Sequence, residues 1–148
     1  MSSKSHNGWP VILSTRSGGT WALPAVTGHV KAGPVWVVFF WLSQEYRRLV
    51  EPIDRTQSWG HAYRKISGSA KYSNHASGTA VDFNAVKHPF RTSAQDNMTA
   101  AQIKACEQLV ADSGGVLRWL SGHDPMHWEI APGATLSAVL SFANRLLQ

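Results

Sequence analysis

The segment KYSNHASGTAVDFNAV, residues 71–86, constrains the fold of this chain more than any other stretch. Its second half alternates as a half-buried strand does, with Thr79, Val81 and Phe83 on one face. Asp82 lies on the opposite face, where a carboxylate is either solvated or directed at a partner. The pattern therefore predicts a short strand that separates an apolar side from a side able to carry chemistry.

A second segment, SGHDPMHWEIAPG at residues 121–133, alternates in the same way after Pro125. Its expected apolar face consists of Met126, Trp128 and Ile130. His127 and Glu129 take the other face, and Asp124 stands three residues before His127 in a predicted turn. The chain thus has two strand segments whose polar faces present an aspartate and a histidine.

These two polar faces together suggest a metal site. Asp82, His127 and the nearby His75 form a set of two imidazoles and one carboxylate. Such a set suits catalytic zinc, because three protein ligands leave a fourth position open for water. Asp124 is then the candidate general base, with Glu129 as the second choice. Spacing alone leaves open a structural role for these histidines, because the chain has seven of them.

The same residues resemble the motifs of a known family. SNHASGTAVD fills every position of the signature Ser-x-His-x-x-Gly-x-Ala-x-Asp of the M15 zinc peptidases. DPMHWEI resembles the second motif of that family, and SWGHAYRKISGS resembles the segment upstream. The chain is therefore similar to the branch that contains D-alanyl-D-alanine carboxypeptidases and phage L-alanyl-D-glutamate endopeptidases. The resemblance covers residues from about 45 to 131.

The resemblance implies a role for each matching residue. It implies one zinc ion with the ligands His75, Asp82 and His127. Asp124 would be the base, which takes a proton from water and later gives it to the leaving amine. Arg64 matches the family arginine that polarises the scissile carbonyl and stabilises the oxyanion. Considered by itself, Arg64 can equally be a surface cation beside Lys65.

Two further signature positions follow from the same resemblance. Ser73 is similar to the signature serine, and its implied role is contact with the substrate. Gly78 is expected to permit a tight turn that brings His75 back over Asp82. The family pattern does not use His123, which adjoins Asp124, so its role stays open.

The first predicted helix lies in GPVWVVFFWLSQEYRRLVEPID. Pro34 suits a first helical position, and Pro52 ends the helix. The expected inward stripe is Val35, Val38, Phe39, Leu42, Tyr46 and Leu49. The outer side is also apolar, with Trp36, Phe40 and Trp41. This favours a nearly buried core helix over an exposed contact patch.

The remaining elements are predicted from shorter patterns. IDRTQSWGHAYRKISG leads through a strand into the signature, and KHPFRTSAQDNM is a loop. TAAQIKACEQLVADSGG is a second helix, with Thr99 and Gln102 in capping-box spacing and Cys106 as a buried structural thiol. VLRWL and MHWEIA are short strands, and ATLSAVLSFANRLL is a closing amphipathic helix.

The predicted fold class is α+β, with a small, mostly antiparallel sheet, packed helices and a metal cleft on its open face. It resembles the fold of the D,D-peptidases and of the hedgehog signalling domain. A length of 148 residues favours one zinc peptidase domain over residues 1–148. Residues 1–33, rich in Gly, Ser and Thr, are expected to be irregular apart from one short strand, which leaves residues 34–148 as the core.

Other residues that could join a site are assigned more ordinary roles. His61 and His88 flank the motifs, and we expect them at the surface or supporting the ligands. Trp59, Trp119 and Trp128 are expected in the core, with the lining of a cleft as the alternative.

Charge and hydropathy limit the partners. The net charge of +5 suits anionic wall polymers, whereas the scattered basic residues do not predict a nucleic-acid partner. VWVVFFWL is too short to span a membrane, so membrane insertion is not expected, and MSSKSHNGWPVIL lacks the apolar core of a secretory signal. We therefore expect synthesis in the cytoplasm and action at the bacterial cell wall after release.

The resemblance implies a zinc-dependent peptidoglycan peptidase, and the set of two histidines and one aspartate is consistent with it. The favoured activity is that of a phage endolysin cleaving L-alanyl-D-glutamate in the stem peptide. The alternative is a D-alanyl-D-alanine carboxypeptidase or D,D-endopeptidase, since the resemblance covers those activities as well. A hypothesis of another class is a zinc-binding wall-interaction module without catalysis.

Overall fold

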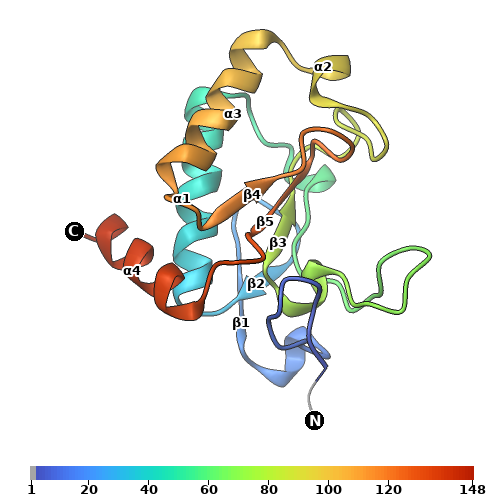
Figure 1. Ribbon diagram of the computed structural model, residues 1–148, viewed down its shortest axis with the longest axis vertical. Coiled ribbons are helices and arrows are strands. Elements are labelled where there is room, and N and C mark those ends of the chain that lie inside the picture. The colour runs from blue at the N-terminus through green and yellow to red at the C-terminus, as the bar shows by residue number, and fades with distance from the viewer. Residues whose placement is uncertain (1–2) are drawn as a thin grey trace.

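The computed structural model describes residues 3–148. Its α-helices are α1 (Pro34–Leu49), α2 (Ala94–Asn97), α3 (Ala100–Asp112) and α4 (Leu136–Leu146). Its strands are β1 (Thr20–Ala22), β2 (His29–Lys31), β3 (Ala80–Asp82), β4 (Leu117–Trp119) and β5 (His127–Ile130). Short 3-10 helices are η1 (Thr15–Ser17), η2 (Arg55–Gln57) and η3 (Asn74–Ser77). In Figure 1, α1, α3 and α4 lie on one side of the strands, and the loop around residues 63–72 projects on the other.

The strands form two small antiparallel sheets. The larger sheet has the order β3-β5-β4, so its central strand comes from the second sequence motif. Its register places Asp82 opposite His127 and Trp119 opposite Trp128. The smaller sheet is the β1-β2 pair. The α+β class with small antiparallel sheets and packed helices is therefore confirmed.

Helix α1 begins and packs as its sequence predicts. Pro34 occupies the first turn after Gly33, and the inward stripe is buried up to Tyr46. Leu49 was expected to complete the stripe, but this prediction was wrong, because the side chain is 40% exposed. The helix ends at Leu49, so this side chain lies in the last turn of α1.

The apolar outer side of α1 is partly covered by other elements. Trp41 packs edge-on against Phe142 of α4. Trp36 stacks on Phe40, and its indole N–H donates to the carbonyl oxygen of Ala22 in β1. Trp36 and Trp41 are therefore partly covered, as the nearly buried helix predicts, whereas Phe40 is 36% exposed.

Helix α3 confirms its predicted cap. The Thr99 side chain accepts from the Gln102 N–H, and the Gln102 side chain accepts from the Thr99 N–H. Cys106 is buried, and burial together with the charge of Glu51 raises the pKa of its thiol to about 12. A thiol with such a pKa is protonated at neutral pH, which fits the predicted structural role.

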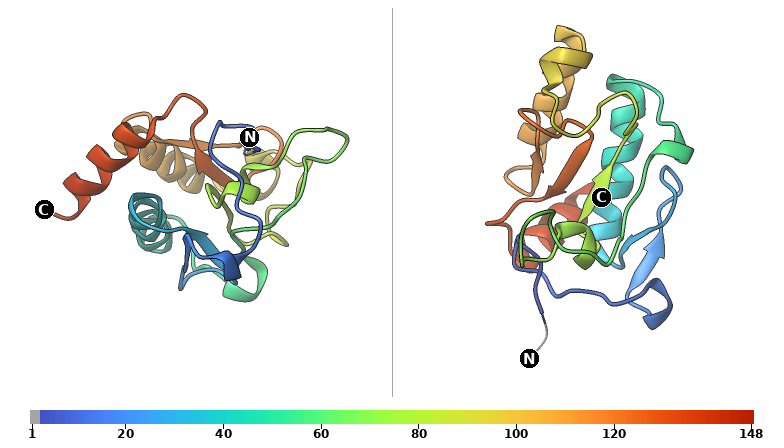
Figure 2. Two further views of the ribbon diagram at one scale, coloured as in Figure 1. Left: turned by 90° about the horizontal axis from the view of Figure 1, so that it is seen from below. Right: turned by 90° about the vertical axis from the view of Figure 1, so that its right-hand side faces the viewer.

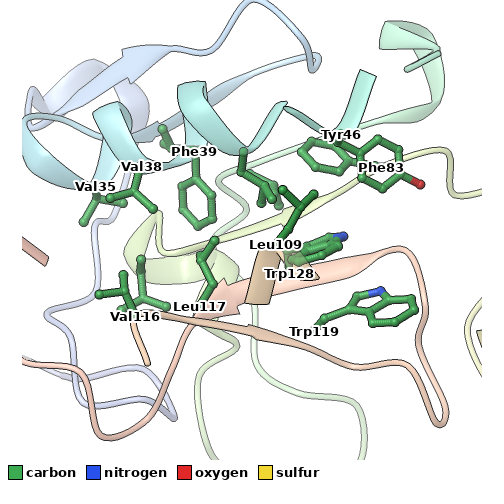
Figure 3. Close-up of a cluster of buried hydrophobic side chains, with 14 of the residues drawn as sticks. Val35, Val38, Phe39, Tyr46, Phe83, Leu109, Val116, Leu117, Trp119 and Trp128 are labelled. Carbon is green, nitrogen blue, oxygen red and sulfur yellow. The ribbon is translucent and has the colours of Figure 1, made fainter. Parts of the chain in front are cut away.

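The core lies between α1, α3 and the apolar face of the larger sheet. Figure 3 shows Val38 and Phe39 of α1 facing Leu117 and Trp128 of the sheet. Trp119 and Trp128 stack with their ring centroids 5.5 Å apart, as the core prediction for these residues requires. Trp59 differs, because it is 42% exposed and lines the cavity described below.

The N-terminal segment is more ordered than its composition predicts. It forms the two strands β1 and β2 instead of one, and four of its side chains join the core: Trp9, Leu23, Val26 and Val30. The sequence did not predict that these side chains join the core, because the apolar residues between the turn residues have no local periodicity. Figure 2 shows the N-terminal segment, in blue, running as an extended chain against the rest of the fold.

Two local predictions between the helices also differ. The expected loop 87–98 contains the short helix α2, which begins with a capping box formed by Ser93 and Asp96. The strand expected before the signature is replaced by η2 and by isolated bridges of Trp59 to Thr27 and Asp82. An isolated bridge pairs one residue with a residue from a distant segment. The local sequence pattern is the same for such a bridge and for a strand, so it could not distinguish the two.

His88 is buried in a polar network, so the expectation of a surface position was wrong. Its Nε2 lies 2.6 Å from Oε2 of Glu51, and its Nδ1 lies 2.9 Å from Oδ1 of Asn97. Both partners are acceptors, so a doubly protonated imidazolium satisfies both bonds. Tyr46 and Asn84 also donate to Glu51, and the network joins the end of α1 to the segment that precedes α2.

This pair predicts a pH-dependent stability. Burial would raise the pKa of Glu51, but the hydrogen bonds from His88, Asn84 and Tyr46 outweigh it and lower the pKa to about 2. Burial would lower the pKa of His88, but the hydrogen bonds to Glu51 and Asn97 raise it. The Glu51 contribution is therefore lost as the pH falls below about 4.5, and the His88 contribution is lost as the pH rises above about 6.5.

The measurement is the free energy of unfolding of wild type and His88→Gln in urea, at about pH 5.5 and about pH 8.5. We expect wild type to be more stable by on the order of 1 kcal/mol at the lower pH and by less at the higher pH. The contributions of the other titrating groups cancel in this difference, because both proteins contain them. An equal difference at both pH values would contradict an imidazolium at position 88.

Within residues 3–148, none of the helices has the length and apolar character needed to cross a membrane.

Candidate active site

One cavity of about 820 Å³ contains all six site residues that the sequence predicts. These are Arg64, Ser73, His75, Asp82, Asp124 and His127. They come from the 63–72 loop, from η3, from β3, from the turn before β5 and from β5 itself. The cavity opens on the polar face of the larger sheet, opposite the core, as the strand alternation predicts.

The short helix η3 positions His75. The Ser73 side chain caps it by accepting from the His75 N–H at 3.1 Å. Gly78 ends it in the left-handed conformation, with φ of 70°. A Cβ atom at Gly78 would lie 2.6 Å from the backbone nitrogen of Lys31, so the turn also needs glycine for space. The turn therefore returns the chain directly from His75 into β3.

Sheet register brings the remaining ligand candidates together. Asp82 and His127 are paired residues of β3 and β5, and their Oδ1 and Nδ1 atoms lie 3.1 Å apart. Nε2 of His75 lies 3.1 Å from Oδ2 of Asp82. One ligand atom from each of the three residues lies within 4.8 Å of the others, and all three side chains are buried. This is the compact arrangement that a single ion requires.

The orientation of His75 is set by a backbone carbonyl. Its Nδ1 lies 2.8 Å from the Gly60 oxygen, and since a carbonyl only accepts, Nδ1 carries the proton. The Nε2 lone pair therefore faces Asp82 and the cavity. A Cβ atom at Gly60 would lie 2.2 Å from the His29 oxygen, so only glycine lets this carbonyl approach.

Glu129 supports His127 through the ring nitrogen that does not face Asp82. Its Oε1 lies 2.7 Å from Nε2 of His127, while Arg118 approaches its other oxygen at 3.7 Å. Burial would raise the pKa of Glu129, but the hydrogen bond from His127 lowers it. Glu129, the second choice for the base, is therefore engaged as an acceptor for His127, in the position that commonly orients a metal-binding imidazole.

The protonation states fit a divalent metal. Burial would raise the pKa of Asp82, but the charge of His75 and the hydrogen bond from His127 hold it below its usual range. Burial would lower the pKa of His127, but the bonds to Asp82 and Glu129 raise it to about 9. A cation bound at Nδ1 would replace the proton that this carboxylate-rich environment favours.

Unpartnered polar atoms point to the same place. Four buried side-chain nitrogen or oxygen atoms lack a hydrogen-bond partner within the described chain. Three of them belong to cavity residues: Nε2 of His75, Oδ1 of Asp124 and Oε2 of Glu129. Buried polar atoms without partners are unfavourable, so their concentration here indicates a site built for a ligand.

Asp124 lies beside the three ligand candidates. The turn holds it through its own N–H, which donates to Leu120, and through the His127 N–H, which donates to its carbonyl oxygen. Its Oδ2 is 3.8 Å from Nδ1 of His127. Burial raises the pKa of Asp124, and the charge of Asp82 adds to this against the attraction of the histidines. A raised pKa makes the carboxylate a stronger base.

The structure also places residues whose part in the site the sequence left open or did not predict. Arg91, Arg118 and Trp59 line the cavity, together with His123, whose role the sequence left open. His61 is half-buried, and its Nε2 donates to the carbonyl oxygen of Ile12. Arg91 and Arg118 lie outside both motifs, so only the folded chain identifies them.

One of the comparisons with known proteins gave a match. Residues 67–130 match the M15 peptidase family model that is described as D-alanyl-D-alanine carboxypeptidase. The match supports an M15 family peptidase. Neither a comparison with curated proteins nor one with solved structures gave a match.

The M15 match spans both motifs. It includes five of the six predicted site residues, whereas Arg64 lies just before it. M15 peptidases are zinc-dependent, and the buried His75, Asp82 and His127 group is able to bind a metal. At the level of the family, the match supports a peptidase that acts on peptidoglycan.

Proposed function

We propose that this protein is a zinc-dependent peptidase that hydrolyses L-alanyl-D-glutamate in the stem peptide of peptidoglycan, as a phage endolysin does. The observation that carries the proposal is the convergence of His75, Asp82 and His127 in one cavity with Asp124 beside them. D-alanyl-D-alanine carboxypeptidase or D,D-endopeptidase activity is the second candidate, favoured by the description of the matching family model.

One zinc ion held by His75, Asp82 and His127 supplies the Lewis acidity that amide hydrolysis at neutral pH requires. The protein contributes a fixed donor set, because Gly60 orients one imidazole and Glu129 orients the other.

Asp124 acts as the general base and then as the general acid. Its raised pKa and its unpartnered oxygen suit it to accept a proton from the attacking water. The same carboxyl group then donates this proton to the leaving amine. The turn that fixes Asp124 next to His127 keeps the proton transfer at one end of the cavity.

Arg64 and Ser73 bind the substrate. Arg64 is an exposed cation on the 63–72 loop, where its guanidinium stabilises negative charge on the scissile carbonyl oxygen. The Ser73 oxygen already accepts from the His75 N–H, and its hydroxyl group remains able to donate to a substrate atom.

The partners and the place of action follow from this activity. The substrate is the stem peptide, and the net charge of +5 adds a nonspecific attraction to anionic wall polymers. We assign residues 1–148 to one peptidase domain that is made in the cytoplasm and acts on the cell wall after release.

A zinc-binding wall-interaction module without catalysis is less well supported. Such a module has no need of a base or of a cation for the oxyanion. Asp124 and Arg64 line the same cavity as the three ligand candidates, which favours turnover.

Digestion of purified meso-diaminopimelate peptidoglycan tests the proposal, with the new termini read by mass spectrometry. We expect new amino termini on D-glutamate, loss of cleavage in the presence of a chelator, and recovery when zinc is added back. Release of free D-alanine would identify the carboxypeptidase instead. Intact muropeptides under all conditions, with zinc still bound, would favour the binding module.

A further inference from the structure

Arg91 is a cation in the catalytic cavity for which the proposed chemistry has no role. It lines the cavity with Arg64 and Arg118. Arg118 approaches Glu129, whereas neither Arg64 nor Arg91 forms an ion pair within the part of the chain that the structure describes. The Arg91 guanidinium lies over the ring of Phe90, 5.6 Å from its centroid, and the side chain is exposed. It is therefore available to an anionic group of a substrate.

The backbone holds Arg91 next to the catalytic turn. The Arg91 N–H donates to the His123 carbonyl at 2.7 Å, and the Ala94 N–H donates to the Ser121 carbonyl at 2.7 Å. Arg91 has a φ of 68°, a left-handed conformation that is unfavourable for residues other than glycine. The segment is thus attached at two points to the turn that carries Asp124.

The other cavity cation without an ion pair in the described residues, Arg64, is attached to a different segment. The Arg64 carbonyl accepts from the Ser73 N–H at 3.0 Å, so Arg64 is attached to the segment that carries His75. Arg64 and Arg91 therefore belong to different segments that line the same cavity, one before η3 and the other beside the turn that carries Asp124. The proposed chemistry assigns Arg64 to the carbonyl oxygen and Asp124 to the leaving amine.

In the proposed chemistry the leaving amine takes its proton from Asp124, and Arg91 is attached to the turn that carries Asp124. We infer that Arg91 binds the carboxylate that is carried by the same amino acid as the leaving amine. Arginine suits this role, because its planar guanidinium forms paired hydrogen bonds with a carboxylate. The inference rests on the proposed function, since it uses the direction that Asp124 and Arg64 impose on the substrate.

Both proposed cleavage reactions present such a carboxylate. In L-alanyl-D-glutamate linked onward through the side chain, the new amine and the free α-carboxylate belong to the same glutamate. In D-alanyl-D-alanine, the new amine belongs to the terminal alanine, whose carboxylate is also free. Arg91 thus recognises the shared chemistry, an α-carboxylate beside the scissile amide, and not one particular side chain.

The experiment compares two synthetic stem peptides that differ in one group. One carries D-glutamate with a free α-carboxylate, and the other carries D-isoglutamine, in which an amide removes the charge. We expect Arg91→Gln to lower kcat/KM about tenfold for the acid, mainly through KM, and to leave the value for the amide close to wild type. Arg47→Gln, on an exposed turn of α1 outside the cavity, is the matched control.

A binding measurement separates this inference from the proposed function. Calorimetry on the zinc-loaded wild type and Arg91→Gln, each also carrying Asp124→Asn to prevent turnover, gives the dissociation constants of both peptides. A preference for the acid that disappears in Arg91→Gln supports the inference even if wild type cleaves neither peptide. An equal loss for acid and amide, or no preference for the acid in the presence of Arg91, would overturn it.

The same comparison covers the alternative activity. If wild type releases D-alanine and does not cut L-alanyl-D-glutamate, the endopeptidase proposal fails. The test is then repeated with peptides that end in D-alanyl-D-alanine and in its terminal amide. Loss of discrimination in Arg91→Gln would again support the inference, and retained discrimination would contradict it.

Discussion

Replacing Asp124 with asparagine is expected to lower kcat for stem-peptide cleavage on the order of 10²- to 10⁴-fold. Asparagine has nearly the same shape, but its amide cannot accept a proton from water or carry it to the leaving amine. Zinc binding is expected to remain, because His75, Asp82 and His127 are unchanged and Asp124 lies outside the group whose ligand atoms converge. The change thus separates catalysis from metal binding.

The measurement is single-turnover cleavage of a stem peptide together with zinc affinity from competition with a chromophoric chelator. Asp112→Asn is the matched control, because this aspartate is exposed at the end of α3. We expect it to retain wild-type rates. An Asp124→Asn protein that binds zinc and cleaves at the wild-type rate would show that another group is the base.

Replacing Glu129 with glutamine is expected to weaken zinc binding about 10- to 100-fold. The carboxylate accepts from Nε2 of His127 at 2.7 Å and so holds the other ring nitrogen towards Asp82. A neutral amide is a weaker acceptor and leaves Arg118 without its negative partner. The imidazole then loses both its orientation and part of its basicity.

The readout is the zinc dissociation constant, with the melting temperature of the metal-free protein measured alongside. Glu107→Gln is the control, because Glu107 is exposed on α3 and lies outside the cavity. Cleavage at saturating zinc should recover most of the wild-type rate if Glu129 acts only through His127. If Glu129→Gln kept the wild-type zinc affinity but lost the cleavage rate, this would instead indicate that Glu129 acts as the base.

Local sequence patterns predicted the elements that have strong periodicity or clear caps. Each of these patterns depends on residues that are close in the sequence. Examples are the inward stripe of α1, the capping box of α3 and the alternation of β5. The N-terminal strands and α2 were missed or underestimated for the opposite reason. Trp9 and Val30 find their partners in the core only after distant elements have packed.

The candidate site shows the same division. The two motifs contain the residues that converge, because strand alternation places Asp82 and His127 on polar faces and Gly78 permits the turn after His75. Their proximity in space follows from the pairing of β3 with β5, which joins residues 45 positions apart. No local pattern specifies that pairing, so spacing alone left a structural role open.

The sequence by itself determined which donor atoms this protein can offer, since side-chain chemistry and local backbone preference are properties of short segments. Only the tertiary structure decided how those atoms are oriented and what surrounds them. The Gly60 carbonyl sets the proton on His75, Glu129 turns His127, and the His123 carbonyl holds Arg91 at the cavity. These contacts depend on directional hydrogen bonds between segments that meet only in the folded chain.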